Sequence, residues 1–317
     1  MNSIFSKAKL GSQLGARPPV AVELSPQGVL AAATPGAGKP PVYAFEPLPA
    51  GVLIPGIGEQ NLRAPQIIAN AMRSALDQVS PRSHSVTLVL PDTAVRVFVL
   101  DFDALPAKPV EAISVLRFRL RKMIPFEVEH AGLSYQVLTV TKNECRVLAA
   151  VLPGPVLAEY EAVTRLAGYE PGAILPASLA ALGAVDSLGT ADPDAPVLAA
   201  NLGPLALTTT ITQGQDLLLY RTLDLPEEPA QRLAEVQRGI AVAAAYYEDK
   251  LGARPMLLYY AGIGAGGNSS AEDFAHWIDD SEMTVADLAP RPETGAATPL
   301  GNLVSLAGVV GALAGAS

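Results

Sequence analysis

The sequence predicts an α/β protein of two lobes that repeat one pattern of secondary structure. Each half begins with a strand, a tight turn and a second strand, at residues 20–33 and again at residues 197–213. Half of the residues are hydrophobic but only 5% are aromatic, which is typical of parallel sheets covered by helices with small side chains. The length of 317 residues exceeds what one ordinary core requires and favours two domains.

In the first half, hydrophobic runs bounded by turn residues predict strands, and apolar residues at helical spacing predict helices. The expected strands cover residues 20–24, 29–33, 42–46, 85–91, 95–102, 133–140 and 144–152. The expected helices cover residues 66–79, 110–123, 155–167 and 176–188. The helix over 110–123 should stop before Pro125, because the residue that precedes a proline disfavours helical geometry.

The second half restarts the same order. Strands are expected at residues 197–202, 206–213, 216–223 and 256–260, and helices at 227–251, 271–279 and 303–314. A glycine-rich turn over 262–267 follows the fourth of these strands, and proline-rich loops fill 280–298. Duplication of a hairpin-plus-helix unit is how two-lobed folds that clamp a nucleotide are built.

Charge and residue types exclude several classes of function. The net charge of −9 argues against a nucleic-acid partner, because such proteins need a basic face. The one basic run is expected to be the solvated face of a helix, with a patch for an anion or an acidic partner as the alternative; it consists of Arg117, Arg119, Arg121 and Lys122. The single cysteine, Cys145, and three widely separated histidines indicate neither a disulfide nor a metal site.

No targeting or membrane-spanning segment is predicted. Residues 1–16 lack a continuous apolar stretch and are expected to form an N-terminal tail. The most apolar segment, residues 303–314, is shorter than the ~20 residues that a bilayer span requires. The sequence therefore predicts a soluble, cytoplasmic protein.

The middle of the chain resembles a known family. Residues 123–129 read MIPFEVE and residues 133–138 read LSYQVL, which resembles a segment of the type IV pilus assembly (PilM) family. Residues 147–151 and 160–170 are similar to the strand and helix that follow in that family. The segment 120–185 carries the resemblance, and the order of elements extends it over residues 18–314. Type II secretion proteins of the GspL kind share this architecture.

The resemblance implies the actin-like ATPase fold, an RNase H-like duplicated fold with two lobes around a nucleotide cleft. In this chain it implies a first lobe over residues 17–106 that returns at 175–190 and 300–317. It further implies an inserted α/β subdomain over 107–174 and a second lobe over 195–299. The second lobe is expected to be reduced, because residues 223–226 lead directly into the long helix and leave no room for the family's usual small subdomain.

The resemblance also implies where a nucleotide site would lie and that it is degenerate. The matching positions are Glu23, Ser25, Asn201, Gly203, Thr208, Gly262 and Gly264. Leu24 replaces a glycine of the first turn, Asn201 replaces an acidic residue, and Pro26 and Pro204 each remove an N–H donor. No catalytic residue, metal or cofactor is therefore expected, and Mg·ATP is what an active member of the fold would need.

The partner that the resemblance implies is the cytoplasmic N-terminal tail of a bitopic inner-membrane pilus protein (PilN-like). The tail would bind between the first lobe and the insert, which would hold the chain at the inner face of the membrane. Candidate contacts are Val97, Val99, Phe126 and Tyr135. An extended tail can add hydrogen bonds at a strand edge and place side chains in pockets.

Two alternative functions stay open, and a third is excluded by the sequence. One is a GspL-like secretion component, which would use the same architecture. Another is an active ATPase or small-molecule kinase, which needs a carboxylate from each lobe; besides Glu23, the acidic residues at strand ends are Asp101, Asp103, Asp216 and Asp224. A dehydrogenase is excluded, because no acidic strand end follows the glycines at 262–267 at the required distance.

Overall fold

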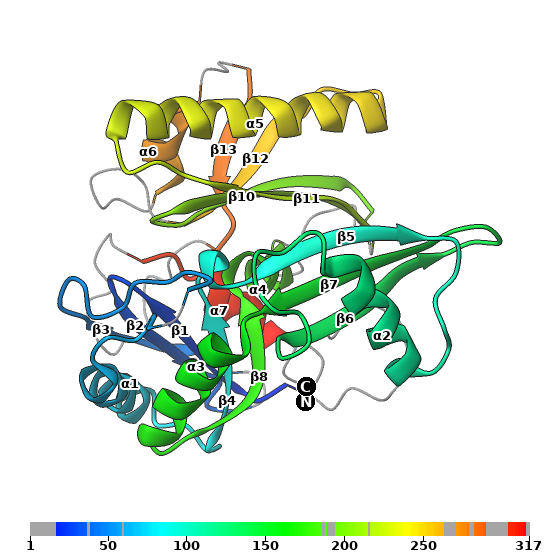
Figure 1. Ribbon diagram of the computed structural model, residues 1–317. Helices are drawn as coiled ribbons and strands as arrows, with labels where there is room; N and C mark the ends of the chain where they lie inside the picture. Colours follow the sequence, from blue (N-terminus) through cyan, green and yellow to red (C-terminus); the bar gives the residue numbers. More distant parts are fainter. Residues whose placement is uncertain are drawn as a thin grey trace.

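A computed structural model describes residues 17–314, apart from 37–38, 59, 186–187, 189–193, 215, 263–269, 279–281 and 290–303. The expected N-terminal tail at 1–16 lies outside the described residues. The chain forms two five-stranded sheets and one three-stranded sheet. Figure 1 shows the second lobe at the top, the first lobe below it and the three-stranded unit at the right.

The first lobe is built on a sheet with the strand order β3-β2-β1-β4-β8. Its strands are β1 (Val20–Ser25), β2 (Gly28–Ala33), β3 (Val42–Pro47), β4 (Ser85–Leu90) and β8 (Glu170–Pro176). The first three strands are antiparallel, whereas β4 runs parallel to β1 and to β8. Helix α1 (Pro65–Val79) packs on β2 and β3, and α3 (Gly154–Leu166) packs on α1 and β8.

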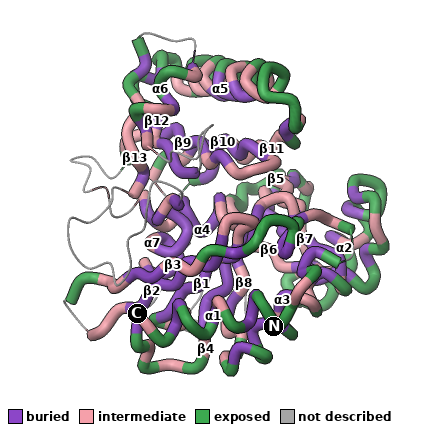
Figure 2. The backbone as a smooth tube through the Cα atoms, turned by 90° about the vertical axis from the view of Figure 1, so that its left-hand side faces the viewer, coloured by how far each residue is buried: buried purple, intermediate pink, exposed green. Residues whose placement is uncertain are grey.

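The second lobe has the same strand order and the same strand directions. Its sheet runs β11-β10-β9-β12-β13, with β9 (Pro196–Leu202), β10 (Ala206–Gln213), β11 (Asp216–Asp224), β12 (Leu257–Gly262) and β13 (Thr284–Asp287). As in the first lobe, three antiparallel strands are followed by two parallel ones. The predicted duplication is therefore confirmed. Figure 2 shows buried residues in the strands of both sheets and exposed residues along the long helix of this lobe.

That long helix, α5 (Pro229–Leu251), follows β11 almost at once. Residues 225–228 alone separate the two elements. The Glu228 carboxylate accepts hydrogen bonds from the N–H groups of Ala230 and Gln231, which caps the helix. Gly252, with φ of 68°, ends it. A shorter helix, α6 (Ala271–Ala275), packs on β13 and β12. The direct connection leaves the second lobe without a further subdomain at this point.

The third sheet forms the insert and has the order β5-β7-β6. It contains β5 (Arg96–Phe102), β6 (Gly132–Val140) and β7 (Cys145–Leu152), with helix α2 (Pro109–Leu120) between β5 and β6. The insert thus covers residues 96–152 rather than the predicted 107–174. The reason is that β5 pairs along its whole length with β7, whereas Val156, Tyr160 and Val163 of α3 are buried in the core of the first lobe.

Two helices with small residues cross where the lobes join. They are α4 (Ala177–Val185) and α7 (Ala307–Ala314). A Cβ atom at Gly311 would lie 1.9 Å from the carbonyl oxygen of Ala180, and one at Gly183 would lie 2.4 Å from that of Gly311. The two backbones therefore touch. Among the described residues, no helix combines the length and the hydrophobicity needed to cross a membrane.

Most predicted elements are confirmed within a few residues, and two strands were missed. Strand β8 carries Pro171, Gly172 and Pro176, which argue against a strand in a sequence. They are tolerated because β8 is an end strand, which pairs on one side only. Strand β13, in a region predicted as loop, has four residues and is fixed by its parallel pairing with β12. A short 3₁₀ helix at Asp92–Ala94 was also missed.

Candidate functional site

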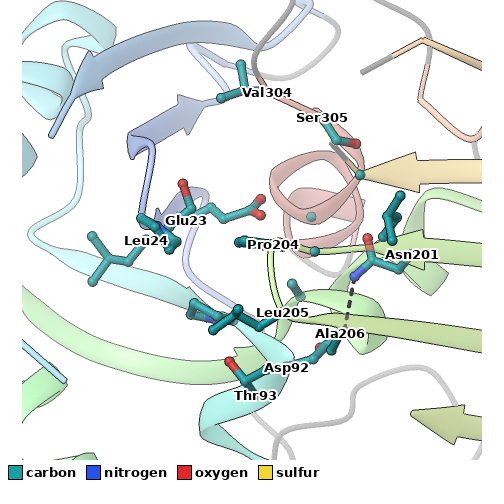
Figure 3. A pocket seen from close by; sticks show the side chains of 18 of the residues that line it. Glu23, Leu24, Asp92, Thr93, Asn201, Pro204, Leu205, Ala206, Val304 and Ser305 are labelled. Atoms are coloured by element: carbon teal, nitrogen blue, oxygen red, sulfur yellow. Dashed lines mark hydrogen bonds between the residues drawn. The ribbon is translucent and has the colours of Figure 1, made fainter. Parts of the chain in front are cut away.

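A cavity lies between the two lobes, where the nucleotide site was predicted (Figure 3). Its volume, counted as the space open to the centres of water molecules, is about 60 Å³. Five of the predicted residues line it, namely Glu23, Ser25, Asn201, Gly203 and Gly262. Thr208 lies beside it, hydrogen-bonded to Asp92, and Gly264 lies outside the described residues.

Strand direction explains why residues so far apart in sequence meet here. Glu23 near the end of β1 is in register with Val89 of the parallel strand β4. In the second lobe, Asn201 is in register with Ala261 of β12. The carboxyl ends of parallel strands lie at one edge of a sheet, and ligands of α/β proteins bind at that edge. The two edges face one another across the cavity.

The turns that would hold phosphate are occupied by bonds within the protein. The Ser25 hydroxyl accepts a hydrogen bond from the Gly28 N–H (3.3 Å) and donates one to the Gly28 carbonyl (3.1 Å). In the second lobe, the Arg232 guanidinium of α5 donates to the carbonyl oxygens of Gly203 (2.8 Å) and Pro204. The Gly28 N–H is thus used within the first turn, and neither Pro26 nor Pro204 has an N–H, so fewer donors face the cavity.

A half-buried carboxylate that the sequence analysis missed joins the two lobes. Asp92 Oδ1 accepts from the backbone N–H (3.0 Å) and the hydroxyl (2.9 Å) of Ser178 in α4. Asp92 Oδ2 accepts from the Asn201 amide (3.1 Å) and the Thr208 hydroxyl (2.9 Å) of the second lobe. We call these four residues the Asp92 network. The Tyr220 hydroxyl extends it by donating to Ser178 Oγ (2.5 Å).

The two carboxyl groups of the cavity differ in their surroundings. Burial raises the pKa of Asp92, and its four hydrogen bonds act in the opposite direction. Burial, and secondly the charge of Asp92, raise the pKa of Glu23 to about 8. Glu23 Oε2 makes no hydrogen bond to the described residues. A Cβ atom at Gly308 would lie 2.3 Å from this oxygen, so glycine is needed there to make room for it.

These groups offer little to a magnesium ion, which prefers ionised carboxylate oxygens. Each oxygen of Asp92 already accepts two hydrogen bonds. Glu23, with its raised pKa, is largely protonated at neutral pH. In the part of the chain that the structure describes, no three His, Cys, Asp or Glu residues are grouped so that they could hold a metal. The residues present therefore do not fit a magnesium nucleotide.

The four acidic residues considered from the sequence lie elsewhere. Asp101 forms an ion pair with Arg146 within the insert (2.8 Å), and Asp224 lies 3.8 Å from Arg96. Asp103 and Asp216 are exposed, and none of the four lines the cavity. The signal for Asp92 in the sequence is its place just after the predicted strand 85–91, but its partners are set by the tertiary structure.

A second hollow, of about 100 Å³, lies between the insert and the first lobe. Its lining comes from β6, β7, α3 and β8 and comprises Gly132, Leu133, Ser134, Leu152, Leu157, Glu161 and residues 171–174. We call it the insert groove. Strands β6 and β8 are end strands of their sheets, and Glu161 is the one ionisable side chain in the lining.

None of the four predicted partner residues lines the insert groove. Phe126 and Tyr135 are partly buried in the core of the insert. Val97 and Val99 of β5 belong to an apolar cluster with Leu217 of β11, so they join the insert to the second lobe. Contact of these four residues with a partner stays a prediction.

Comparison with known proteins agrees with this architecture. No protein-family model and no curated protein matches the chain. Among solved structures, a chain described as "PilM-PilN type IV pilus biogenesis complex" is similar with a TM-score of 0.71 and 18% identity, covering 96% of this chain and 100% of that one. A Bacteroides thetaiotaomicron protein, described as having an actin-like ATPase fold and unknown function, gives a TM-score of 0.52 and 11% identity over 93% and 95% of the chains.

Similarity at such identities establishes a fold. The two sheets of equal topology, the cavity between them and the three-stranded insert all agree with it. The chain therefore has the actin-like ATPase fold, with an insert in its first lobe.

Proposed function

We propose that this chain is a scaffold of a type IV pilus assembly platform at the inner face of the cell membrane. In this role it binds the cytoplasmic N-terminal tail of a membrane-anchored partner. The observation that carries the proposal is the insert groove, an apolar hollow bordered by two end strands with one carboxylate, Glu161. The similar solved structure is that of a complex between PilM and PilN, which supports a partner of this kind.

The groove suits an extended peptide with apolar and basic side chains. End strands offer backbone donors and acceptors to a further strand. Leu133, Leu152 and Leu157 provide apolar walls. Cytoplasmic segments beside a membrane span are enriched in Lys and Arg, and a cation in such a tail would complement Glu161. Glu161 is held by Arg165 one turn further along α3, at 3.3 Å, so a basic residue of the tail would compete with that pair.

The cleft between the lobes, in this proposal, is a structural joint and not a nucleotide site. The Asp92 network supplies the bond between the lobes that a bound nucleotide would otherwise make. The cavity of about 60 Å³ has room for roughly five water molecules. The insert groove, rather than this cleft, then performs the binding function.

The test uses labelled peptides with the sequences of the cytoplasmic N-terminal tails of single-span membrane proteins encoded beside this gene. Binding to the purified chain is measured by fluorescence anisotropy. We expect one tail to bind and Glu161→Lys to weaken its binding about tenfold or more, because a lysine at this position would repel the basic side chains of the tail. Glu235→Lys is the matched control, because Glu235 also pairs with an arginine of its own helix and its side chain is 30% exposed against 32% for Glu161. Equal losses in both variants would exclude the groove.

A further inference from the structure

Helix α2 of the insert exposes large apolar side chains on its outer face. Its inner face is buried in the insert through Ala112, Leu116 and Leu120. Among the described residues, the two most exposed large hydrophobic side chains are Val110 (78%) and Phe118 (72%). Both belong to α2, which lies at the edge of the molecule (Figures 1 and 2). Single exposed apolar residues are ordinary, but it is unusual for the two most exposed ones to belong to one short helix.

Cations surround these apolar side chains in a chain that is acidic overall. Five basic residues and one acidic residue occupy positions 108–122. Lys108 pairs with Glu111, and Arg121 pairs with Glu129. Arg119 and Lys122 are exposed, and no ion pair of either is found within the described part of the chain. We call Val110, Phe118, Arg119, Lys122 and the exposed Met123 the α2 patch.

We infer that the α2 patch docks on an anionic phospholipid surface. Cations attract anionic headgroups, each strengthening binding about fivefold near the surface. Phe118, Val110 and Met123 can enter the boundary between headgroups and acyl chains, as apolar side chains of interfacial helices do. A deformable surface suits Phe118 because this side chain protrudes and lines neither of the two hollows described above. An acidic protein that contacts the patch would bind without lipid, so the test below distinguishes it from a bilayer.

The affinity of this contact for lipid is low by itself, and it matters most when another contact already holds the chain at the membrane. Two unpaired cations and a few apolar side chains give a low affinity, so binding appears only at high lipid concentration. When another contact already holds the chain at the membrane, the patch acts at a high effective concentration. It would then fix which side of the insert faces the bilayer. The inference does not require the tail partner, because bare lipid is sufficient to show it.

The test is co-sedimentation of the full chain with vesicles. One set contains phosphatidylglycerol and phosphatidylcholine in equal parts, and the other contains phosphatidylcholine alone. We expect pelleting with the anionic vesicles only, and its loss when salt is raised from about 0.1 M to about 1 M, which shortens the Debye length from about 10 Å to about 3 Å. Arg119→Glu with Lys122→Glu should lower the apparent affinity at least about tenfold, and Phe118→Ser about fivefold or more.

Matched controls separate the patch from general charge and hydrophobicity. Lys39→Glu with Arg63→Glu makes the same change of charge at exposed positions of the first lobe. Met256→Ser removes another exposed apolar side chain, in the second lobe. Both should bind vesicles like the wild type, and so should Glu161→Lys, which separates this test from that of the insert groove.

Absence of pelleting, equal pelleting with both lipids, or equal losses in the controls would overturn the inference. The inference would also be overturned if poly-glutamate, but not vesicles, bound in a way that depends on Arg119 and Lys122. That result would identify an acidic protein as the partner.

Discussion

At the scale of residues, two carboxyl groups show how surroundings decide the role of a side chain. Asp92 accepts hydrogen bonds from both lobes, whereas Glu23 points an oxygen without a hydrogen-bond partner among the described residues into the same cavity. Asn201 reaches Asp92 from the second lobe. Its amide can donate to Asp92, whereas a second carboxylate there would repel it. Asn201 thereby contributes to the bond between the lobes.

Replacing Asp92 with alanine should destabilise the protein by about 2–4 kcal/mol, because buried donors of both lobes lose their acceptor. Urea unfolding followed by circular dichroism would measure the change. Asp224→Ala is the control, because Asp224 forms an exposed ion pair, which contributes less than about 1 kcal/mol. If the Asp92 variant were as stable as the control, the network would not join the lobes.

The stability of the wild type should depend on pH through Glu23. Its pKa is raised from 4.5 to about 8 in the folded state, so the folded protein binds the proton more tightly than the unfolded chain. Its contribution to stability is fully present below about pH 4.5 and is lost as the pH rises to about 8. A glutamine side chain cannot titrate, so the stability of Glu23→Gln should not fall in this way as the pH rises.

The measurement is the difference in unfolding free energy between the wild type and Glu23→Gln from pH 4.5 to pH 8. We expect the wild type to lose stability relative to the variant by up to a few kcal/mol. A difference that stays constant with pH would show that Glu23 has an ordinary pKa.

At the scale of elements, the crossing of α4 and α7 depends on glycine. A methyl group at Gly311 would meet the backbone of Ala180, at 1.9 Å, and backbone cannot move aside as a side chain can. Gly239 in α5 is a matched position, since a methyl group there would meet the ends of Leu207 and Leu223 at 2.7 and 2.9 Å. Both changes to alanine bring the same gain in helix propensity.

Gly311→Ala should therefore cost about 3 kcal/mol or more, and Gly239→Ala should change stability by less than about 1 kcal/mol. Thermal unfolding of the two variants would show the difference. Equal midpoints would mean that α4 and α7 can separate without cost and that the lobes are not fixed at this crossing.

At the scale of the whole molecule, the lobes are joined by the Asp92 network and by the helix crossing. A protein joined in this way needs no nucleotide to hold its lobes together. Melting with and without millimolar Mg·ATP should give the same midpoint. A ligand at 100 times its Kd would add about 2.7 kcal/mol and raise the midpoint by roughly 5 °C. A shift of that size, absent with MgCl₂ alone, would contradict the proposed role of the cleft.

The sequence by itself determined the elements and their duplication. Strand and helix signals are local, because side-chain periodicity and turn residues act over a few positions. The sequence therefore showed the two halves and the long helix after β11. The family resemblance singled out Leu24, Pro26, Asn201 and Pro204. Residues 23, 25, 201, 203 and 262 line one cavity, where the family resemblance implied a cleft.

Only the tertiary structure decided which segments pair and which side chains face one another. Strands β5, β8 and β13 are assigned to their sheets by partners far away in the chain, so the limits of the insert could not be read from local signals. Asp92 was missed because its role depends on donors from α4, β9 and β10. The insert groove and the exposed face of α2 are likewise surfaces made by packing, and a hydrophobic residue in a sequence does not show whether it lies inside or outside.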